Sequence, residues 1–109
     1  MLYKFKSKVA SDIIMLEPNG RHILSLWGRV HEAELRKGIL LAADMPAAIA
    51  ALEEAIAMDD AQRAQEAMHA QERGEERAPN GVGLRQRAMP LLEMARRSQA
   101  AGKDITWGV

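Results

Sequence analysis

Aromatic residues and lysines alternate within LYKFKS, residues 2–7 of the chain. Tyr3 and Phe5 fall on one side and the lysines on the other, which is the period of a half-buried β-strand. The outward lysines are typical of an edge strand, because charge discourages pairing with foreign strands. A turn at residues 10–12 then leads to a short apolar run, which predicts a second, antiparallel strand at residues 13–16.

The Pro-Asn-Gly sequence at residues 18–20 predicts a break after the second strand. Beyond it, Ile23, Leu24 and Trp27 recur at helical spacing. This spacing predicts a short helix that ends at Gly28, since glycine readily adopts the left-handed conformation that terminates helices.

Two further strands are predicted from short apolar runs, at residues 39–42 and at residues 104–108. The polar segment 29–37 between the first helix and the third strand is compatible with either a helical extension or a loop. The last strand lies in a segment that frays unless it is tied down. We therefore expect it to pair with an N-terminal or central strand and to bury Trp107.

The strongest helical pattern starts at Asp44, a suitable N-cap, with Pro46 in the first turn. Its apolar stripe thins beyond Asp59, so we expect the second half to be a more solvated helix that projects from the body. Residues 74–83 contain three glycines and a proline, which predicts a flexible linker.

Apolar residues at three- and four-residue spacing predict a last helix that starts at residue 84 and ends at Gly102. Pro90 removes one backbone hydrogen bond inside it, so we expect a kink or a restart there. The elements together predict an α+β fold, in which two or three helices pack on one face of a small, mainly antiparallel sheet of three to four short strands. Residues 1–109 are expected to form a single domain.

The composition is that of a globular protein, with 48% hydrophobic and 28% charged residues. Two tryptophans, one tyrosine and one phenylalanine are the only aromatic residues, and alanine supplies much of the apolar content. The core is therefore expected to be thin, and a homodimer that adds buried surface is an open alternative.

The sequence contains no cysteine, which excludes disulfides and thiolate catalysis and fits a reducing cytoplasm. The N-terminus lacks the apolar run of a signal peptide. No apolar run approaches the roughly 20 residues that a membrane helix needs. We expect a cytoplasmic protein that does not enter the membrane.

The net charge is zero, but its distribution along the chain is uneven. Residues 1–40 hold seven Lys/Arg against four Asp/Glu, a balance of +3; residues 41–77 hold three against nine, a balance of −6. Residues 78–109 hold five against two, again +3. Since the acidic middle can neutralise both basic flanks, the pattern speaks against a nucleic-acid partner.

No pattern in the sequence carries recognised catalytic, metal or cofactor chemistry. Glu66 and His69 have the E-x-x-H spacing of di-iron bundles, but no second pair accompanies them. His31 begins an H-E sequence without the second histidine of a zinc protease. Neither a phosphate-binding glycine loop nor a G-x-S-x-G elbow is present. We therefore assign no catalytic, metal or cofactor-binding residues.

The arginines and tryptophans are the remaining candidates for contact residues. Arginine prefers planar partners such as carboxylates and phosphates. The arginines of the last helix therefore predict either an anion or partner surface, or pairing with the acidic helix of the same chain; they are Arg85, Arg87, Arg96 and Arg97. Trp27 and Trp107 are candidate core residues or interface anchors, and the scarcity of aromatic residues favours the core.

Two hypotheses of function follow. The first is a non-enzymatic interaction or accessory protein that self-associates through the acidic helix and the arginine-bearing last helix. The second is a protein that binds, or an enzyme that acts on, a small anionic metabolite through Arg85, Arg87 or Arg96. No further cofactor or partner is implied.

Three stretches of the chain resemble a known family: LYKFKSKVASDIIMLEPNG at the start, DMPAAIAALEEAI in the middle and LRQRAMPLLEMARRSQAAGKDITWGV at the end. The family is a small proteobacterial one of unknown function, number 1840, and the resemblance covers nearly the whole chain. A tryptophan often precedes the proline of the last helix in the family, whereas this chain has Met89 there. The resemblance implies a cytoplasmic bacterial protein, complete at this length, and no catalytic residues.

Overall fold

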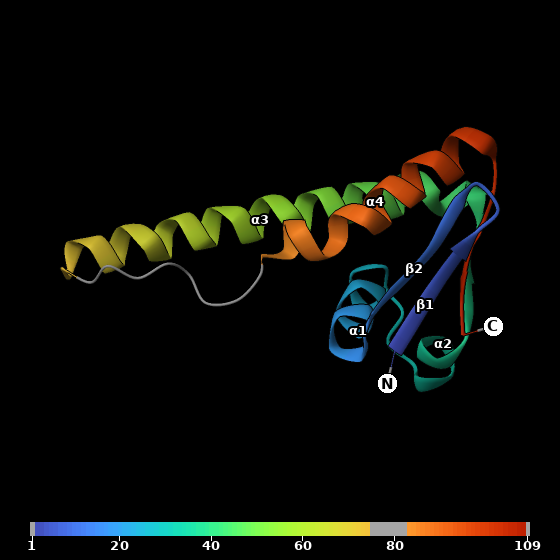
Figure 1. Cartoon of the computed structure of the whole chain (residues 1–109), viewed down its shortest axis with the longest axis horizontal. Coiled ribbons are helices and arrows are strands. Elements are labelled where there is room, and N and C mark those ends of the chain that lie inside the picture. The colour runs from blue at the N-terminus through green and yellow to red at the C-terminus, as the bar shows by residue number, and fades with distance from the viewer. Residues whose placement is uncertain (1, 75–82, 109) are drawn as a thin grey trace.

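A computed structural model describes residues 2–74 and 83–108 of the chain (Figure 1). Its fold is α+β, as predicted, and mostly helical. Four α-helices lie in the described residues rather than the expected two or three. The elements in chain order are β1 (Leu2–Ser7), β2 (Ala10–Leu16), α1 (Glu17–Leu26), α2 (Glu32–Arg36), β3 (Gly38–Leu40), the 3-10 turn η1 (Ala42–Asp44), α3 (Met45–Glu72), α4 (Leu84–Ala101) and β4 (Ile105–Trp107).

The four strands form one antiparallel sheet in the order β2-β1-β4-β3. The C-terminal strand β4 therefore lies between β1 and β3, which confirms that the chain end is tied into the sheet. Phe5 and Gly38 are both paired with Trp107, one from each neighbouring strand. A side chain on Gly38 would collide with the Trp107 ring, so glycine is required there.

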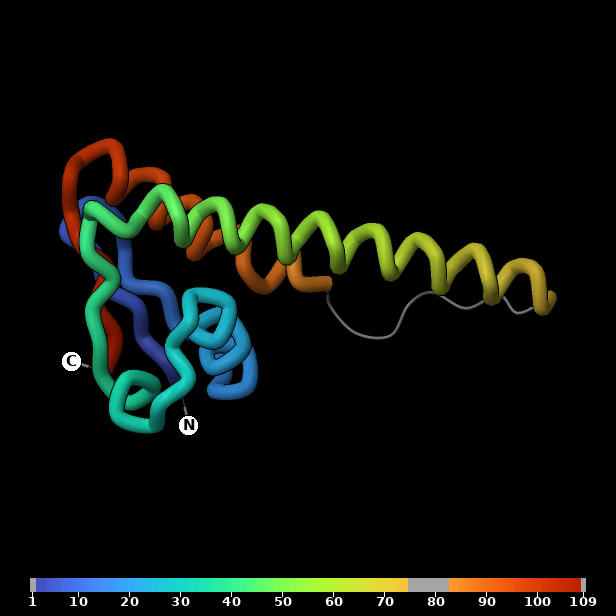
Figure 2. Tube along the Cα trace, turned by 180° about the vertical axis from the view of Figure 1, so that it is seen from behind, coloured from blue at the N-terminus to red at the C-terminus, as the bar shows by residue number. Residues whose placement is uncertain are grey.

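The prediction that β1 is an edge strand is wrong, because β2 and β4 pair with its two sides. Its lysines mark an uncovered face of the sheet instead. Burial alternates along the strands: Tyr3 and Phe5 are partly or fully covered, whereas Leu2 and Lys4 are exposed. In the described part of the chain, helices pack only on the face of the sheet that carries Tyr3 and Phe5 (Figures 1 and 2).

The core lies between the covered face of the sheet and the helices α1, α3 and α4. Its largest fully buried side chains come from every layer of the fold and are Phe5, Ile23, Leu24, Met45, Leu52, Leu91, Met94, Ile105 and Trp107. The prediction that the C-terminal strand buries Trp107 is confirmed.

Two boundaries near the N-terminus differ from the prediction. The expected turn at residues 10–12 belongs to β2, where Ala10 pairs with Ser7 across an irregularity in the register. The expected break at residues 18–20 is absent, since α1 begins at Glu17 with the proline in its first turn. Proline is favoured there because its missing N–H would have no helical partner.

The open question about segment 29–37 has a mixed answer, because the five-residue helix α2 lies between two non-helical stretches. The third strand, β3, ends at Leu40, before the predicted limit of residue 42. Residues 42–44 instead form the turn η1, whose first N–H, at Ala42, donates to Asp104 Oδ1 at 2.7 Å.

The helix α3 is continuous over 28 residues. The helix α4 packs along only the first half of α3 (Figure 2). The second half projects from the body, as predicted, and the molecule measures 49 × 29 × 23 Å. Of the kink or restart expected at Pro90, the restart is wrong, because α4 continues through Pro90 as one helix. It ends at Gly102, whose φ of 66° is left-handed. The predicted linker at 74–83 lies almost wholly outside the described residues.

Candidate functional site

The arginines of α4 mostly face groups of their own chain. Arg85 forms an ion pair with Asp60 at 2.6 Å, and Arg96 lies 3.7 Å from Glu53. Both carboxylates belong to α3, so these exposed pairs bridge the two long helices. Surface pairs of this kind contribute about 0–1 kcal/mol each.

The other two candidate arginines lie apart from each other. Arg87 donates to the Asn19 side chain of α1 at 2.9 Å, and its Nε is buried without a partner in the described residues. Arg97 lines a small pocket of about 210 Å³ near the start of β2, together with the carboxylates of Asp12 and Glu93. The four arginines thus form no common cluster in the described pockets.

Asp59 caps α4 from a distant position in the sequence. Its Oδ2 accepts a hydrogen bond from the backbone N–H of Leu84 at 3.0 Å. That N–H belongs to the first turn of α4, where helical partners are missing, and the local N-cap Gly83 has no side chain to supply one. Sequence reasoning missed this role, because nothing near Leu84 indicates which distant carboxylate reaches it.

The two tryptophans lie together under the sheet's covered face. Their ring centroids are 6.3 Å apart, and Phe5 contacts both at 6.3 and 6.2 Å. Trp107 is fully buried and donates its Nε1–H to the carbonyl of Glu34 at 2.8 Å. Trp27 is only partly buried, and its Nε1 is buried without a partner in the described residues.

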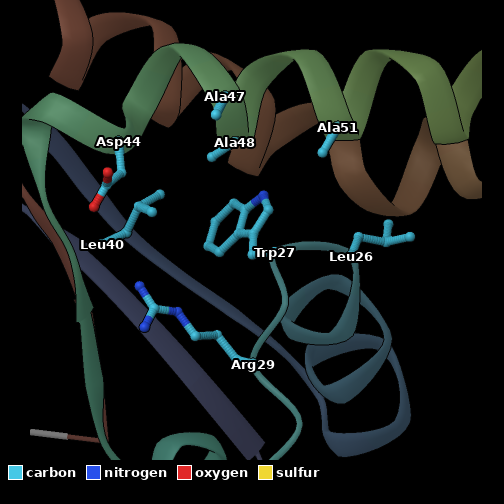
Figure 3. Close-up of a pocket in the computed structure, with 8 residues that line it drawn as sticks. All are labelled: Leu26, Trp27, Arg29, Leu40, Asp44, Ala47, Ala48 and Ala51. Carbon is cyan, nitrogen blue, oxygen red and sulfur yellow. The ribbon is translucent and has the colours of Figure 1, made fainter.

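Trp27 faces a cavity between the end of α1, strand β3 and the first turns of α3 (Figure 3). The cavity has a volume of about 300 Å³ and is lined by Leu26, Trp27, Arg29, Leu40, Asp44, Ala47, Ala48 and Ala51. After α1 the chain turns at Gly28, whose φ of 80° is left-handed. The alanines leave the space open, because each carries only a Cβ where α3 passes over the indole.

Arg29 enters this cavity from the connection between α1 and α2. Its guanidinium donates to the carbonyl of Ile39 at 3.2 Å and lies 5.8 Å from the Trp107 ring. Its Nε is buried without a partner in the described residues. Sequence reasoning missed Arg29, since only folding brings it next to both tryptophans; its place just after the Trp-Gly pair was the one local signal.

A second pocket, of about 620 Å³, lies at the N-terminal end of β1 and contains an ion network. Arg21 binds Glu17 at 2.8 Å and Glu32 at 2.9 Å, and so links α1 to α2. The hydrogen bond from Arg21 lowers the pKa of Glu32 below its usual value and raises that of Arg21 above its own. Burial raises the pKa of the neighbouring Tyr3, and the charge of Arg21 opposes this rise.

The uncovered side of the sheet presents apolar residues and lysines together. Leu2 and Leu16 are 63% and 62% exposed there. The outer sheet face, as we name it, is formed by Leu2, Lys4, Lys6, Ile14, Leu16, Ile39 and Thr106, which share one side by their pairing register. At one end it opens into a groove of about 530 Å³ that includes Lys6, Lys8 and Lys103.

The histidines and the E-x-x-H pair do not form a site in the described residues. Glu66 and His69 are exposed on α3, and His22 and His31 are exposed near α1 and α2. Across residues 2–74 and 83–108, no three His, Cys, Asp or Glu side chains are grouped so that they could hold a metal ion. No helix of the described chain is long and apolar enough to span a membrane.

Comparison with known proteins identifies a family but no function. No curated protein and no solved structure matches the chain. The family model for a domain of unknown function (DUF1840) matches residues 1–107, nearly the whole chain. The chain therefore belongs to this family, DUF1840.

Proposed function

We propose that the protein is a non-enzymatic interaction protein that binds a second copy of itself. In this dimer, one side of α3 from one copy lies on the outer sheet face of the other. The observation that carries the proposal is the exposure of large apolar side chains on both surfaces. Met58 and Met68 of α3 are 66% and 59% exposed, comparable to the leucines of the sheet. Contiguous exposed apolar surface is typical of contact sites.

The exposed side of α3 forms a continuous stripe along the helix. Its residues recur at alternating spacings of four and three, the period of one helix face, and all are exposed: Glu54, Met58, Ala61, Gln65, Met68 and Glu72. We call this set the outer stripe of α3. Two methionines suit an irregular contact, because their unbranched side chains adapt to the surface they meet.

Charge favours contact between the outer stripe and the outer sheet face rather than between two sheets. Lys4 and Lys6 on the sheet have no ion-pair partner within the described chain, and neither do Glu54 and Glu72 at the ends of the stripe. Two outer sheet faces would bring lysines against lysines, whereas stripe and sheet bring opposite charges together. Each copy carries both surfaces, so a twofold dimer would contain the contact twice.

The alternative function, binding or conversion of a small anionic metabolite through the arginines of α4, has less support. Arg85 and Arg96 already face Asp60 and Glu53, and their charges are partly neutralised by these carboxylates. Thermal-shift measurements with anionic metabolites, compared between the wild type and Arg85→Gln or Arg96→Gln, would test it directly.

Sedimentation velocity over a wide concentration range tests the dimer. Met58→Lys and Ile14→Lys are each expected to shift the protein to a monomer, since each places a lysine in the apolar part of the contact. Val30→Lys is the matched control, because Val30 is 64% exposed in the connection between α1 and α2, outside both surfaces. A wild type that stays monomeric at high concentration, or a dimer that both variants leave intact, would refute the proposal.

A charge-swap pair tests the orientation of the contact. Lys4→Glu and Glu72→Lys should each weaken the dimer, because each places like charges together. The double variant should recover part of the loss if the two residues approach each other. Strictly additive losses would exclude this pairing of surfaces.

A further inference from the structure

The cavity beside Trp27 has the size and lining of a small-molecule site. Its volume of about 300 Å³ lies at the lower end of the range for ligand pockets, roughly 300–1,000 Å³. Most of its wall is apolar, with Leu26 and Leu40 at the sides and alanines of α3 above the indole (Figure 3). It shares no residue with the outer stripe of α3 or the outer sheet face, so it is independent of the proposed dimer.

Arg29 brings to this cavity a guanidinium group that, in the described part of the chain, has no ion-pair partner and whose N–H groups are not all hydrogen-bonded. Within residues 2–74 and 83–108, no carboxylate lies within ion-pair distance of it, and its one hydrogen bond goes to the Ile39 carbonyl. Its Nε–H is buried and unpartnered. A buried donor without a partner destabilises the fold, and folded proteins leave few of them.

The position of Arg29 is fixed before any ligand arrives. The Ile39 carbonyl holds one side of the guanidinium, and the Trp107 ring lies 5.8 Å away in a cation–π contact. Figure 3 shows the guanidinium directed toward Leu40 and Asp44, at one end of the cavity. A cation held in this way loses little side-chain freedom on binding, which favours affinity.

Among the side chains of the lining, two carry hydrogen-bond donors, Arg29 and Trp27, and one carries acceptors, Asp44. The indole Nε1–H of Trp27 is a second buried donor without a partner, and Figure 3 shows it turned toward Ala48 and Ala51. Asp44 is the one carboxylate among the lining residues, and its side chain is exposed at the edge. The complementary ligand therefore carries acceptors and a negative charge rather than a positive one.

We propose that this cavity binds a small organic carboxylate, with the carboxylate on the Arg29 guanidinium and the apolar body between the Trp27 ring and the alanines of α3. The planar guanidinium matches a carboxylate through paired hydrogen bonds. The apolar wall of Leu26, Leu40 and α3 selects an organic acid over inorganic phosphate, which has no apolar part to bury.

Isothermal titration with benzoate tests the proposal, with tryptophan fluorescence of the same samples as a second readout. Benzoate is expected to bind saturably and to change the emission of Trp27. Benzyl alcohol and inorganic phosphate are expected to bind at least about tenfold more weakly, the equivalent of one lost charge-assisted hydrogen bond. Wild-type protein without saturable benzoate binding, or with equally tight phosphate binding, would overturn the proposal.

Two variants locate the site. Arg29→Gln removes the charge and should weaken benzoate by about tenfold or more. Ala51→Leu fills the cavity without touching Arg29 and should abolish binding while α3 stays folded, since leucine is a good helix former. If Arg29→Gln fails to fold, Ala51→Leu decides alone. Benzoate binding that is unchanged in Ala51→Leu would place the site elsewhere and refute the assignment.

A variant of Asp44 distinguishes a simple carboxylate ligand from a zwitterionic one. For a simple carboxylate, Asp44→Asn removes a like charge from the edge of the cavity, so benzoate should bind as tightly or more tightly. An amino acid such as L-leucine would gain from Asp44 and lose affinity in the same variant. Preference for L-leucine over benzoate, with loss in Asp44→Asn, would replace the proposed ligand class.

Discussion

Trp107 joins the sheet to the short helix α2 as well as to the core. It contacts Phe5 and Trp27, and its indole N–H donates to the carbonyl of Glu34 at 2.8 Å. Trp107→Ala should lower the free energy of unfolding by roughly 3–5 kcal/mol, as for other buried aromatic residues. Urea unfolding followed by circular dichroism measures the change.

Trp107→Phe is the matched control for this position. It keeps a ring in the core but removes the hydrogen bond to Glu34, so its loss should be clearly smaller than that of the alanine variant. An unfolding midpoint of Trp107→Ala equal to that of the wild type would contradict the burial of this residue.

Asp59 offers a residue-scale test of contact between α3 and α4. Asp59→Ala leaves the Leu84 N–H without its acceptor, and loss of a helix cap costs about 0.5–2 kcal/mol. Asp60→Ala is the control, because it removes only an exposed ion pair with Arg85 and should cost about 0–1 kcal/mol. Equal losses in the two variants would show that the cap contributes nothing beyond surface charge.

Single residues were predictable where the local pattern alone decides their place. Trp107 lies in a short apolar run of a chain with few aromatic residues, and these two features predicted its burial. The roles of Arg29 and Asp59 could not be assigned in advance, because their hydrogen-bond partners, Ile39 and Leu84, lie 10 and 25 residues away in the sequence. Such partners are fixed by how the helices pack, which no short stretch of sequence specifies.

At the scale of elements, Arg21 couples α1 to α2 through Glu17 and Glu32. The hydrogen bond from Arg21 lowers the pKa of Glu32 from its ordinary 4.5. A lowered folded-state pKa means that the ionised group stabilises the fold above the unfolded-state value, and that this contribution disappears as the pH falls through the folded-state value. Acidification below about pH 4.5 should therefore loosen the α1–α2 contact.

Thermal unfolding as a function of pH, for the wild type and Glu32→Gln, tests this coupling. Between neutral and acidic pH, the melting temperature of the wild type should fall more than that of the variant, because the variant has no charge to lose at this position. The effect should shrink in high salt, since the pair is exposed. Parallel pH profiles at low salt would exclude a contribution from Glu32.

Elements with a long, regular period were predicted best. Strand β1 follows from alternation and helix α3 from an alanine-rich helical stretch, whereas β4 was predicted from a short apolar run. The start of α1 was missed because Pro18 was interpreted as a breaker, although proline also begins helices. The beginning of β2 was missed because Ser11 and Asp12 are polar, and only the pairing of Ala10 with Ser7 of β1 shows that the strand starts before them.

At the scale of the whole molecule, the chain consists of a body that contains the sheet and an arm formed by the second half of α3 (Figure 1). The buried residues of α3 are Met45, Ala48, Ile49, Leu52, Ile56 and Ala70. All but Ala70 precede the arm, so the arm adds little to the core. The sequence indicated this division, because the apolar stripe of α3 thins beyond Asp59.

The helix α3 continues well past the point where α4 begins beside Asp59, and the self-association that we propose would give this extension a role. Replacing residues 61–82 by a short glycine-rich linker removes most of the arm and four of the six residues of the outer stripe of α3. The shortcut is sterically reasonable, since Asp59 Oδ2 and the Leu84 nitrogen are only 3.0 Å apart. We expect the shortened protein to fold with a free energy of unfolding within about 1–2 kcal/mol of the wild type, because closing a shorter loop costs slightly less entropy.

Sedimentation velocity of the shortened protein should show a monomer at concentrations where the wild type is a dimer, because Met68 and Glu72 are gone. Urea unfolding of the same sample shows whether the body is intact. A folded variant that still forms dimers would move the contact from the arm to the body. A variant that fails to fold would show that the arm stabilises the fold itself, which would contradict the division into body and arm.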